Sequence, residues 1–296
     1  MKNLSIIFLS IFLESLPFIL LGSLISSIIE VFISNDKIAK LIPKNKILGS
    51  IVGVLLGFFI PACDCAVIPV SKRLLKKKVP INVAVSFMLA SPIINPIVLL
   101  STYTAFYKSN PEIFWYRLIF GISISLIIGI ILGVIFKDKD ITINNSDENH
   151  CDCCKHHTNN KLINVINHTM LDMYDVLKYL MLGAFITAIF QTIIPRGVIT
   201  VFNNNQILSI ITMMIFAYLI SLCSTSDSFV GKSLLSQFST TSVLAYLLVG
   251  PMIDIKNTFV LLGNYNKKFV YTLISLIFII IFIFSIGVIL IWKTNI

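Results

Sequence analysis

Charged residues are scarce in this chain: they make up 12% of its 296 residues, whereas hydrophobic residues make up 56%. Soluble globular domains carry about 25% charged residues, so this scarcity excludes an ordinary soluble domain. The mean hydropathy is +0.92, and the apolar residues come in runs of about 20, the length that crosses a bilayer. The composition predicts an all-α integral membrane protein, because a backbone in lipid must satisfy its hydrogen bonds within each segment.

The chain also lacks the short motifs of common enzymes. It contains no HExxH, GxSxG or Walker A motif and no GxGxxG loop between a strand and a helix. We therefore predict a protein that is not an enzyme and that uses an ion gradient or a partner for uphill transport. The net charge of +9 does not indicate nucleic acid binding, because the cations lie at the ends of apolar runs, where anionic lipid explains them.

Eight apolar runs are candidate membrane spans. The first follows Lys2 as a signal peptide would, but it continues past Glu14 and Pro17 without a small-residue cleavage pattern, so we expect it to be retained. The expected spans are residues 4–33, 47–69, 80–103, 114–136, 173–194, 207–223, 243–262 and 269–292.

An even number of spans places both termini on one side of the membrane. Under this count the side of the termini carries twelve loop cations and the other side eight. Because cytoplasmic loops are enriched in lysine and arginine, we expect a multi-pass protein of the plasma membrane with cytoplasmic N- and C-termini. The long loop that begins at residue 137 then also faces the cytoplasm, where thiols stay reduced.

The two halves of the sequence repeat each other. The segment LESLPFILLGSLI aligns with YDVLKYLMLGAFI, IPACDCAVIPVSKRLL with ISLCSTSDSFVGKSLL, and SPIIN with GPMID. These matches predict a first membrane repeat at 1–136, a cytoplasmic loop at 137–170 and a second membrane repeat at 171–296. Four spans in each half imply parallel repeats, whereas one re-entrant segment in each half implies inverted repeats, and the sequence leaves this choice open. Substrates of such transporters bind between the repeats, on broken helices.

The segment IPACDCAVIP places two thiols and a carboxylate between two prolines at the end of an apolar run. Proline favours a helix break, and a broken backbone is tolerated at membrane depth only inside protein or beside water. Thiolates in a Cys-x-Cys pair suit Cu(I), Zn or a trivalent metalloid, although two small buried residues at a helix end are the simpler interpretation. The second half offers one thiol in the matching segment, Cys223, so a shared site would be asymmetric.

The segment ASPIINPIV places two prolines and an asparagine inside the third expected span, and its counterpart in the second half carries Pro251, Asp254 and Lys256. These residues predict an unwound segment at which Asn95 binds a ligand or the freed backbone. A static kink, with asparagine as a link between helices, explains the pattern equally well.

Two acids, Glu14 and Asp175, occupy matching positions in the first span of each half. Acids inside a membrane are costly and usually line a pathway or pair with a cation. Both are therefore candidates for proton coupling, although positions near the membrane surface would also explain them.

The segment HCDCCKHH lies in the expected loop and is rich in metal-binding side chains. Its spacing differs from that of a structural zinc site, so it suits a flexible chelator of Zn or Cu(I), or an adventitious tract. We predict no other cofactor. The candidate metal ligands are His150, Cys151, Cys153, Cys154, His156 and His157.

The segments CDCAVIPVSKRLLKKKVPINVAVSFMLASPIINPIVLLSTYTAF, LCSTSDSFV and LLVGPMIDIKNTFVLLG resemble the predicted permease family that includes the organoarsenical efflux permeases. The resemblance covers the chain except the loop at 137–170, and it implies an eight-span permease of the plasma membrane. It carries over Cys63, Cys65, Pro92, Asn95 and Pro96 as matching positions. The acid between the two thiols departs from the small residue expected there, which favours a harder cation or protonation over a purely thiophilic metalloid.

The sequence thus predicts gradient-driven efflux of a soft metal ion or a trivalent (organo)arsenical. Two alternatives remain: a permease subunit for a small solute that requires a membrane partner, and a membrane-bound metal sensor or chaperone. The expected partners are the lipid bilayer and a small inorganic or organometalloid substrate. The expected substrate path comprises Cys63, Asp64, Cys65, Pro92, Asn95, Pro96, Cys223, Asp227 and Asp254.

Overall fold

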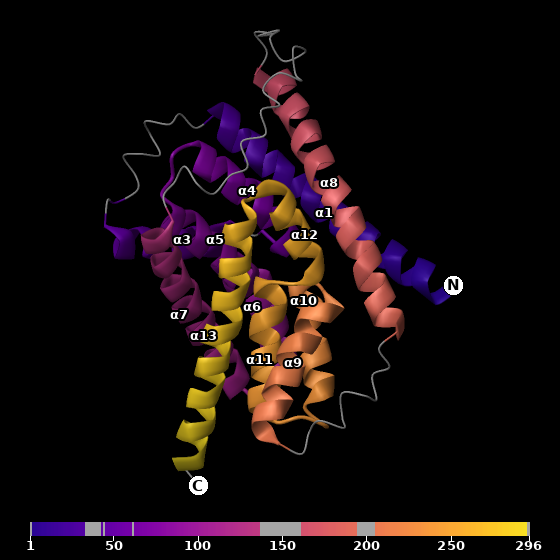
Figure 1. The fold of residues 1–296 in the computed structure, drawn as a ribbon, viewed down its shortest axis with the longest axis vertical. Helices are drawn as coiled ribbons and strands as arrows, with labels where there is room; N and C mark the ends of the chain where they lie inside the picture. The colour runs from indigo at the N-terminus through magenta and orange to yellow at the C-terminus, as the bar shows by residue number, and fades with distance from the viewer. Residues whose placement is uncertain are drawn as a thin grey trace.

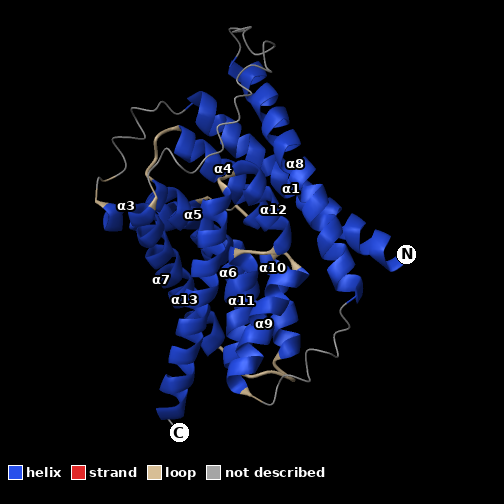
Figure 2. Ribbon diagram, viewed as in Figure 1, coloured by secondary structure: helices blue, strands red, loops and turns tan. Residues whose placement is uncertain are grey.

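The computed structural model describes residues 2–32, 43, 45–60, 62–136, 161–193 and 205–294. Every regular element in these ranges is a helix (Figures 1 and 2). The protein is an all-helical, multi-pass membrane protein, as the composition predicts. In the part of the chain that the structure describes, six helical stretches are long and apolar enough to cross a membrane: Leu4–Val31, Ile81–Phe106, Glu112–Ile135, Ile163–Thr192, Thr240–Asn264 and Lys267–Leu290.

The helices follow the same order in both halves of the chain: a long helix, two short ones, a broken pair and another long helix. The first half contains α1 (Lys2–Phe32), α3 (Lys46–Phe59), α4 (Asp64–Lys76), α5 (Ile81–Ile94), α6 (Pro96–Phe106) and α7 (Glu112–Ile135). The second half contains α8 (Lys161–Ile193), α9 (Gln206–Ile220), α10 (Ser224–Leu234), α11 (Thr240–Met252), α12 (Ile255–Asn264) and α13 (Lys267–Thr294). Helix α8 thus begins inside the segment 137–170 that the sequence predicts as a loop.

Helices α3 and α4 form a hairpin rather than one continuous span. Helix α3 runs alongside α5 in the same direction, because a Cβ added at Gly49 would meet Asn82 and one added at Gly57 would meet Ser91. Helix α4 then returns, since the turn after it leads directly into the start of α5. The amide of Asn82 donates to the carbonyl of Lys46, so α3 and α5 begin at the same end of the molecule.

Helices α9 and α10 form the corresponding hairpin in the second half. Helix α9 runs alongside α11 in the same direction, since Ser209 contacts Ser242 at 2.9 Å and the ring of Phe216 lies 6.1 Å from that of Tyr246. Helix α10 runs back along α11, because Asp227 accepts a hydrogen bond from Tyr246 while Gly231, further along α10, faces Val243, nearer the start of α11.

The two hairpins enter the molecule from opposite ends. Helix α12 runs parallel to α4, with Lys256 at the start of α12 paired to Asp64 and Tyr265, just after its end, 2.7 Å from Ser71. The pair α11–α12 therefore runs toward the end at which α5 begins, opposite to α5–α6. In the described ranges the fold thus consists of six full-length helical stretches and two hairpins, where the sequence predicts eight spans. The expected spans at 47–69 and 207–223 are the two that turn back.

Helix α13 begins beside the end of α7, where the rings of Phe269 and Phe136 lie 5.6 Å apart, and it runs from there to the C-terminus at the bottom of Figure 1, while the N-terminus lies at mid-height in that view. Ring contact between Phe8 and Phe185 places the start of α1 beside the end of α8. The hydroxyl of Ser26 donates to Asp172 at 2.9 Å, which places the end of α1 beside the first half of α8. The sequence predicts the termini and the 137–170 segment on one side, whereas the start of α8, the described part of that segment, lies at the opposite end from the start of α1.

The pairs α5–α6 and α11–α12 are broken near their middles, as the sequence predicts. Asn95 ends α5, and its side-chain oxygen accepts a hydrogen bond from the backbone of Ile97 at 3.0 Å. Asp254 plays the same part for α12 by accepting from the backbone of Asn257 at 2.6 Å. Pro92 and Pro251 lie inside the helices that precede these breaks, while Pro61 lies outside the described residues.

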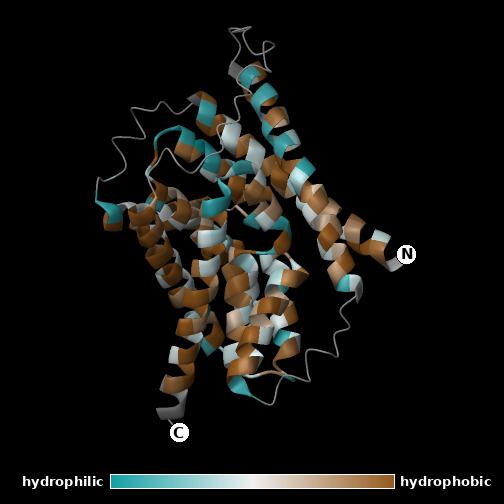
Figure 3. Cartoon of the chain, viewed as in Figure 1, coloured by the Kyte–Doolittle hydropathy of each residue, from teal (hydrophilic) through white to brown (hydrophobic). Residues whose placement is uncertain are grey.

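The buried core and the lipid-facing surface fall on different helices. Every residue of α5 is buried, and so are nearly all residues of α11. Large apolar side chains on α1, α7 and α13, such as Leu9, Trp115 and Ile283, are more than half exposed, as expected for a surface in contact with lipid. Figure 3 shows the hydrophobic residues along α7 and α13 and more hydrophilic residues near the start of α8.

Candidate functional site

The tips of the two hairpins meet in the interior around a small cavity. The three cysteines that the structure describes, Cys63, Cys65 and Cys223, are free thiols, and all of them line this cavity. Its volume is about 10 Å³, which is room for about one water molecule. The cavity is lined by Ile11, Glu14, Ser15, Phe18, Cys63, Asp64, Cys65, Ser221, Cys223 and Lys256.

The hairpin geometry explains why the thiols converge. Cys63 immediately precedes α4 and Cys223 immediately precedes α10, both with extended backbone. Each thiol therefore lies where a hairpin turns, at the positive end of a helix dipole. Cys65 is 3% exposed, and its sulfur lies 3.9 Å from Asp64 Oδ2 and 4.0 Å from Ser15 Oγ.

A buried charge cluster forms the wall of the cavity. Lys256 Nζ lies 3.2 Å from Asp64 Oδ2 and 3.3 Å from Asp254 Oδ2, and all three side chains are at most 4% exposed. Asn257 also donates to Asp64 Oδ2 at 3.2 Å. When both carboxylates are ionised, the cluster carries one negative charge in excess. A proton or a bound cation would balance that charge. Without one, the excess charge is costly, because buried groups are not solvated by water.

Lys256 joins the two halves at this site, and it is not among the site residues predicted from the sequence. Its ammonium group contacts Asp64 on α4, Asp254 before α12 and the backbone carbonyl of Ser221, to which it donates at 3.2 Å. The sequence does contain an indication that Lys256 is functional, because a lysine inside an apolar span is costly and usually has a function.

Only one of the two repeat-matched acids lines the cavity, although Glu14 is exposed and Asp175 is partly exposed. Glu14 lines the cavity, so it keeps its place as a candidate for proton coupling. Asp175 pairs with Lys178 at 2.9 Å, and both side chains are nearly half exposed. The structure therefore brings only Glu14 to the site.

Asp227 belongs to a second buried polar cluster, separate from the thiols. Its Oδ1 accepts a hydrogen bond from Tyr246 at 2.9 Å. Nearby, fully buried Arg117 donates through Nη1 to Thr102 at 2.6 Å and to Ser228 at 2.8 Å. Arg117 is also absent from the sequence prediction, although an arginine inside an expected span is a signal of the same kind as Lys256.

Three further residues of the predicted substrate path lie away from the thiol cavity. Asn95 and Pro96 form the break between α5 and α6, and Pro92 lies within α5; none of the three lines the thiol cavity. The tract His150–His157 lies outside the described residues. Among the residues that the structure does describe, no group of three or more histidine, cysteine or acidic side chains is arranged to hold a metal ion.

These features together define a class of protein. Broken helices and hairpin tips that place charged and thiol groups in the interior of a multi-pass helical protein are features of membrane transporters. A family model named ArsP_1 and described as "Predicted permease" matches residues 1–290, and the chain belongs to this family. The resemblance drawn from the sequence motifs is confirmed.

Two relatives match over nearly their full lengths. UPF0718 protein YcgR of Bacillus subtilis (strain 168) is 40% identical over 279 residues, which cover 94% of each chain. A protein of Streptococcus mutans serotype c named "Putative two-component membrane permease complex subunit" is 38% identical over 284 residues, covering 95% of this chain and 94% of that protein. No solved structure matches the chain.

Proposed function

We propose that this permease exports a soft metal ion or a trivalent (organo)arsenical, driven by an ion gradient. The observation that carries the proposal is that Cys63, Cys65 and Cys223 come from two hairpins and line one small cavity. Thiolates are the preferred protein ligands of soft ions such as Cu(I). Because the thiols sit on hairpins from opposite ends, a substrate held by them would lie between the two halves.

The charge cluster supports a coupled mechanism. Asp64 and Asp254 share one ammonium group, so a proton and a cationic substrate would compete for the same excess negative charge. Glu14 lines the same cavity and offers a further carboxylate for proton transfer. Such competition is one physical route by which a proton gradient drives a cation out.

The helix directions support inverted repeats at 1–136 and 171–296, one of the two arrangements that the sequence leaves open. The corresponding elements of the halves run in opposite directions, and each half supplies one hairpin, one broken helix and two long helices. Transporters built in this way expose a central site to one side and then to the other by rocking one repeat against the other.

We further propose that both termini face outward, which reverses the orientation expected from eight spans. With six crossings and two hairpins, the side of the termini carries five cations: Lys2, Lys108, Arg196, Lys232 and Lys293. The side of the 137–160 connection carries fifteen: Lys37, Lys40, Lys44, Lys46, Lys72, Arg73, Lys76, Lys77, Lys78, Lys137, Lys139, Lys155, Lys161, Lys267 and Lys268. Cations gather on the cytoplasmic side, so this side is placed in the cytoplasm.

Labelling of single cysteines in intact cells tests this orientation. In a chain whose native cysteines are all serine, Asn3→Cys is expected to react with a membrane-impermeant thiol reagent. Ser146→Cys is expected to react only after the cells are permeabilised. The opposite pattern would place the termini in the cytoplasm and overturn the proposed orientation.

Elemental mass spectrometry of cells tests the function. Cells that lack or overexpress the chain are exposed to zinc, copper, cobalt and arsenic, including trivalent organoarsenicals. We expect overexpression to lower the content of one element severalfold, and Cys63→Ser/Cys65→Ser to remove the effect at equal expression. Substitution of an exposed serine that lines neither cavity, Ser236→Ala, serves as the control. Unchanged export by the double variant would contradict the role of the thiols.

A permease subunit that works with a membrane partner is the second candidate, and the name of the Streptococcus mutans relative favours it. Purified chain in liposomes separates the two cases. Transport of the identified element by the chain alone supports a complete exporter, whereas export in cells but none in liposomes supports an obligate partner.

A further inference from the structure

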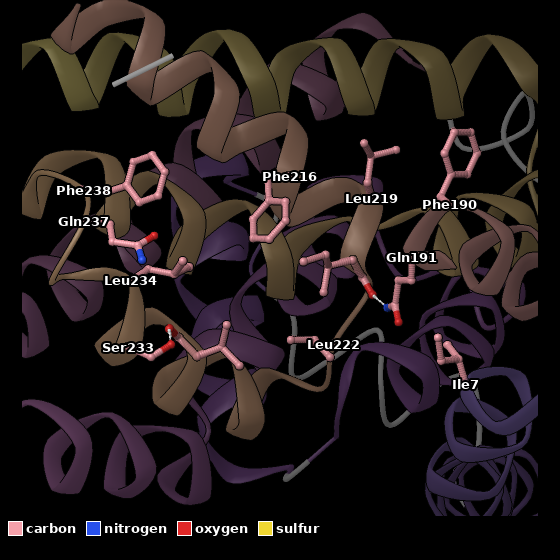
Figure 4. A pocket seen from close by; sticks show the side chains of 12 residues that line it. Ile7, Phe190, Gln191, Phe216, Leu219, Leu222, Ser233, Leu234, Gln237 and Phe238 are labelled. Carbon is pink, nitrogen blue, oxygen red and sulfur yellow. Dashed lines mark hydrogen bonds between the residues drawn. The ribbon is translucent and has the colours of Figure 1, made fainter. Parts of the chain in front are cut away.

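A second and much larger cavity is shown in Figure 4. It adjoins the thiol cavity, because Leu222 lines the large cavity and its neighbours Ser221 and Cys223 line the thiol cavity. Its volume is about 490 Å³, which falls within the range of small-molecule sites. Side chains from the start of α1, the end of α8 and the α9–α10 hairpin line it, among them Ile7, Phe190, Phe216 and Phe238. The lining continues from Ile220 and Leu222 at the hairpin tip to Leu234 at the end of α10 and Phe238 just after it, so this cavity extends from the tip along the hairpin.

A three-residue segment, Ser221–Cys223, separates the two cavities. It joins α9 to α10, and its residues alternate between them: Leu222, like Ile220 before it, lines the large cavity, while Ser221 and Cys223 line the thiol cavity. A single thickness of chain is therefore the wall between the two cavities.

This wall is held from outside by two side chains. Gln191 on α8 donates from Nε2 to the carbonyl of Ile220 (Figure 4). Lys256 on α12 donates to the carbonyl of Ser221 at 3.2 Å. Ser221 has a φ of 52°, a left-handed conformation that residues other than glycine rarely adopt and that persists where the surroundings hold it.

We propose that the large cavity is an access chamber to the thiol site and that Ser221–Cys223 is the movable partition between them. Gln191 is a positioning residue that keeps the partition closed. Lys256 links the partition to the charge cluster, because the same ammonium group donates to the carbonyl of Ser221 and pairs with both Asp64 and Asp254. Protonation of these carboxylates, or binding of a cation to them, would therefore alter the hydrogen bond from Lys256 to the carbonyl of Ser221. The inference rests on the proposed permease function and assigns one access route to its site.

Reactivity of a buried thiol tests the partition without any substrate. The protein keeps Cys65 alone, with Cys63, Cys151, Cys153, Cys154 and Cys223 replaced by serine, and is purified in detergent. A small charged methanethiosulfonate reagent is added, and the rate of modification is followed by mass spectrometry. Cys65 is 3% exposed and lines only the thiol cavity, so it reacts slowly while the partition is closed.

We expect Gln191→Ala to raise the rate at Cys65 about tenfold. Gln191→Glu keeps the size of the side chain, but its ionised form cannot donate a hydrogen bond to Ile220, so we expect it to raise the rate at Cys65 as well. This second variant keeps the test valid if Gln191→Ala does not fold. Gln206→Ala, an exposed glutamine at the start of α9 that lines neither cavity, is the matched control and should leave the rate unchanged.

A second reporter tests the chamber itself. Leu222→Cys, as the only cysteine, should react fast with Gln191 present or replaced, because it lines the chamber side of the partition. Equal rates at Cys65 in the parent and both Gln191 variants would overturn the gating role, and an unreactive Leu222→Cys would overturn the access chamber. Since neither readout needs transport, a gated partition with no metal or arsenical export would reject the proposed substrate class alone.

Discussion

Replacing Lys256 with methionine is expected to prevent most of the protein from folding. The substitution keeps the length of the side chain but leaves Asp64 and Asp254 buried without a cation, both at most 3% exposed in their side chains. Removing one partner of a buried ion pair costs about 3–5 kcal/mol. We expect a large fall in the yield of monodisperse protein in detergent and a strongly lowered melting temperature, measured by size-exclusion chromatography after heating.

The chain offers a matched control for this prediction. Lys178→Met removes the cation of an ion pair that is nearly half exposed, with Asp175 at 2.9 Å, and exposed pairs contribute about 0–1 kcal/mol. Its melting temperature should stay close to that of the parent. Adding Asp64→Asn to Lys256→Met removes the charge excess at one of the two carboxylates and should recover part of the loss. A Lys256→Met protein as stable as the parent would mean that the carboxylates do not need this cation.

Replacing Gly53 with valine is expected to separate α3 from α5 and to abolish folded protein. A Cβ at this position would overlap the carbonyl oxygen of Val83 and approach the Cβ of Ser86 to 3.1 Å. The obstacle is backbone of a fully buried helix, so it cannot move aside as a flexible side chain would. Overpacking typically costs 1–3 kcal/mol, and a rigid obstacle raises the cost. Yield and melting temperature in detergent measure the effect.

Gly287 provides the control for glycine substitution. It lies in α13, and a Cβ added there meets no atom within 4 Å. Gly287→Val should therefore fold with normal yield and melting temperature. If Gly53→Val behaved like Gly287→Val, α3 would not pack against α5 as closely as the structure indicates.

The sequence predicts the class and the breaks but not the hairpins. Scarce charge and long apolar runs are sufficient to identify membrane helices, and the prolines and Asn95 mark where helices end. The stretch 47–69, however, has 23 residues and is long enough to cross the bilayer. Pro61 indicates a break within it, but a break alone does not show whether the chain continues across or turns back. The turn depends on how α3 packs along α5, which Gly49, Gly53 and Gly57 permit. This spacing of four is a packing signal that can be read only once a partner helix is known.

The site was predicted in part, for a similar reason. Alignment of the halves identifies Cys63 and Cys223 as equivalent, and their convergence follows from hairpins that meet at their tips. Asp227 carries the same kind of signal as Asp254, yet it belongs to the cluster around Arg117 and Tyr246. The sequence cannot distinguish an acid at the thiol cavity from one in the Arg117 cluster, because it does not specify which helix lies opposite each acid.

The opposed directions of the two halves bear on how such a protein arises. The inverted repeats proposed above imply that the gene of a shorter ancestor was duplicated. That ancestor, of half this length, would have inserted into the membrane in both orientations and paired with an inverted copy of itself. Fusion of two copies fixes their ratio and gives each half one orientation. It also frees the two tips to diverge, which accounts for a Cys-Asp-Cys sequence at one tip and a Cys-Ser-Thr sequence at the other.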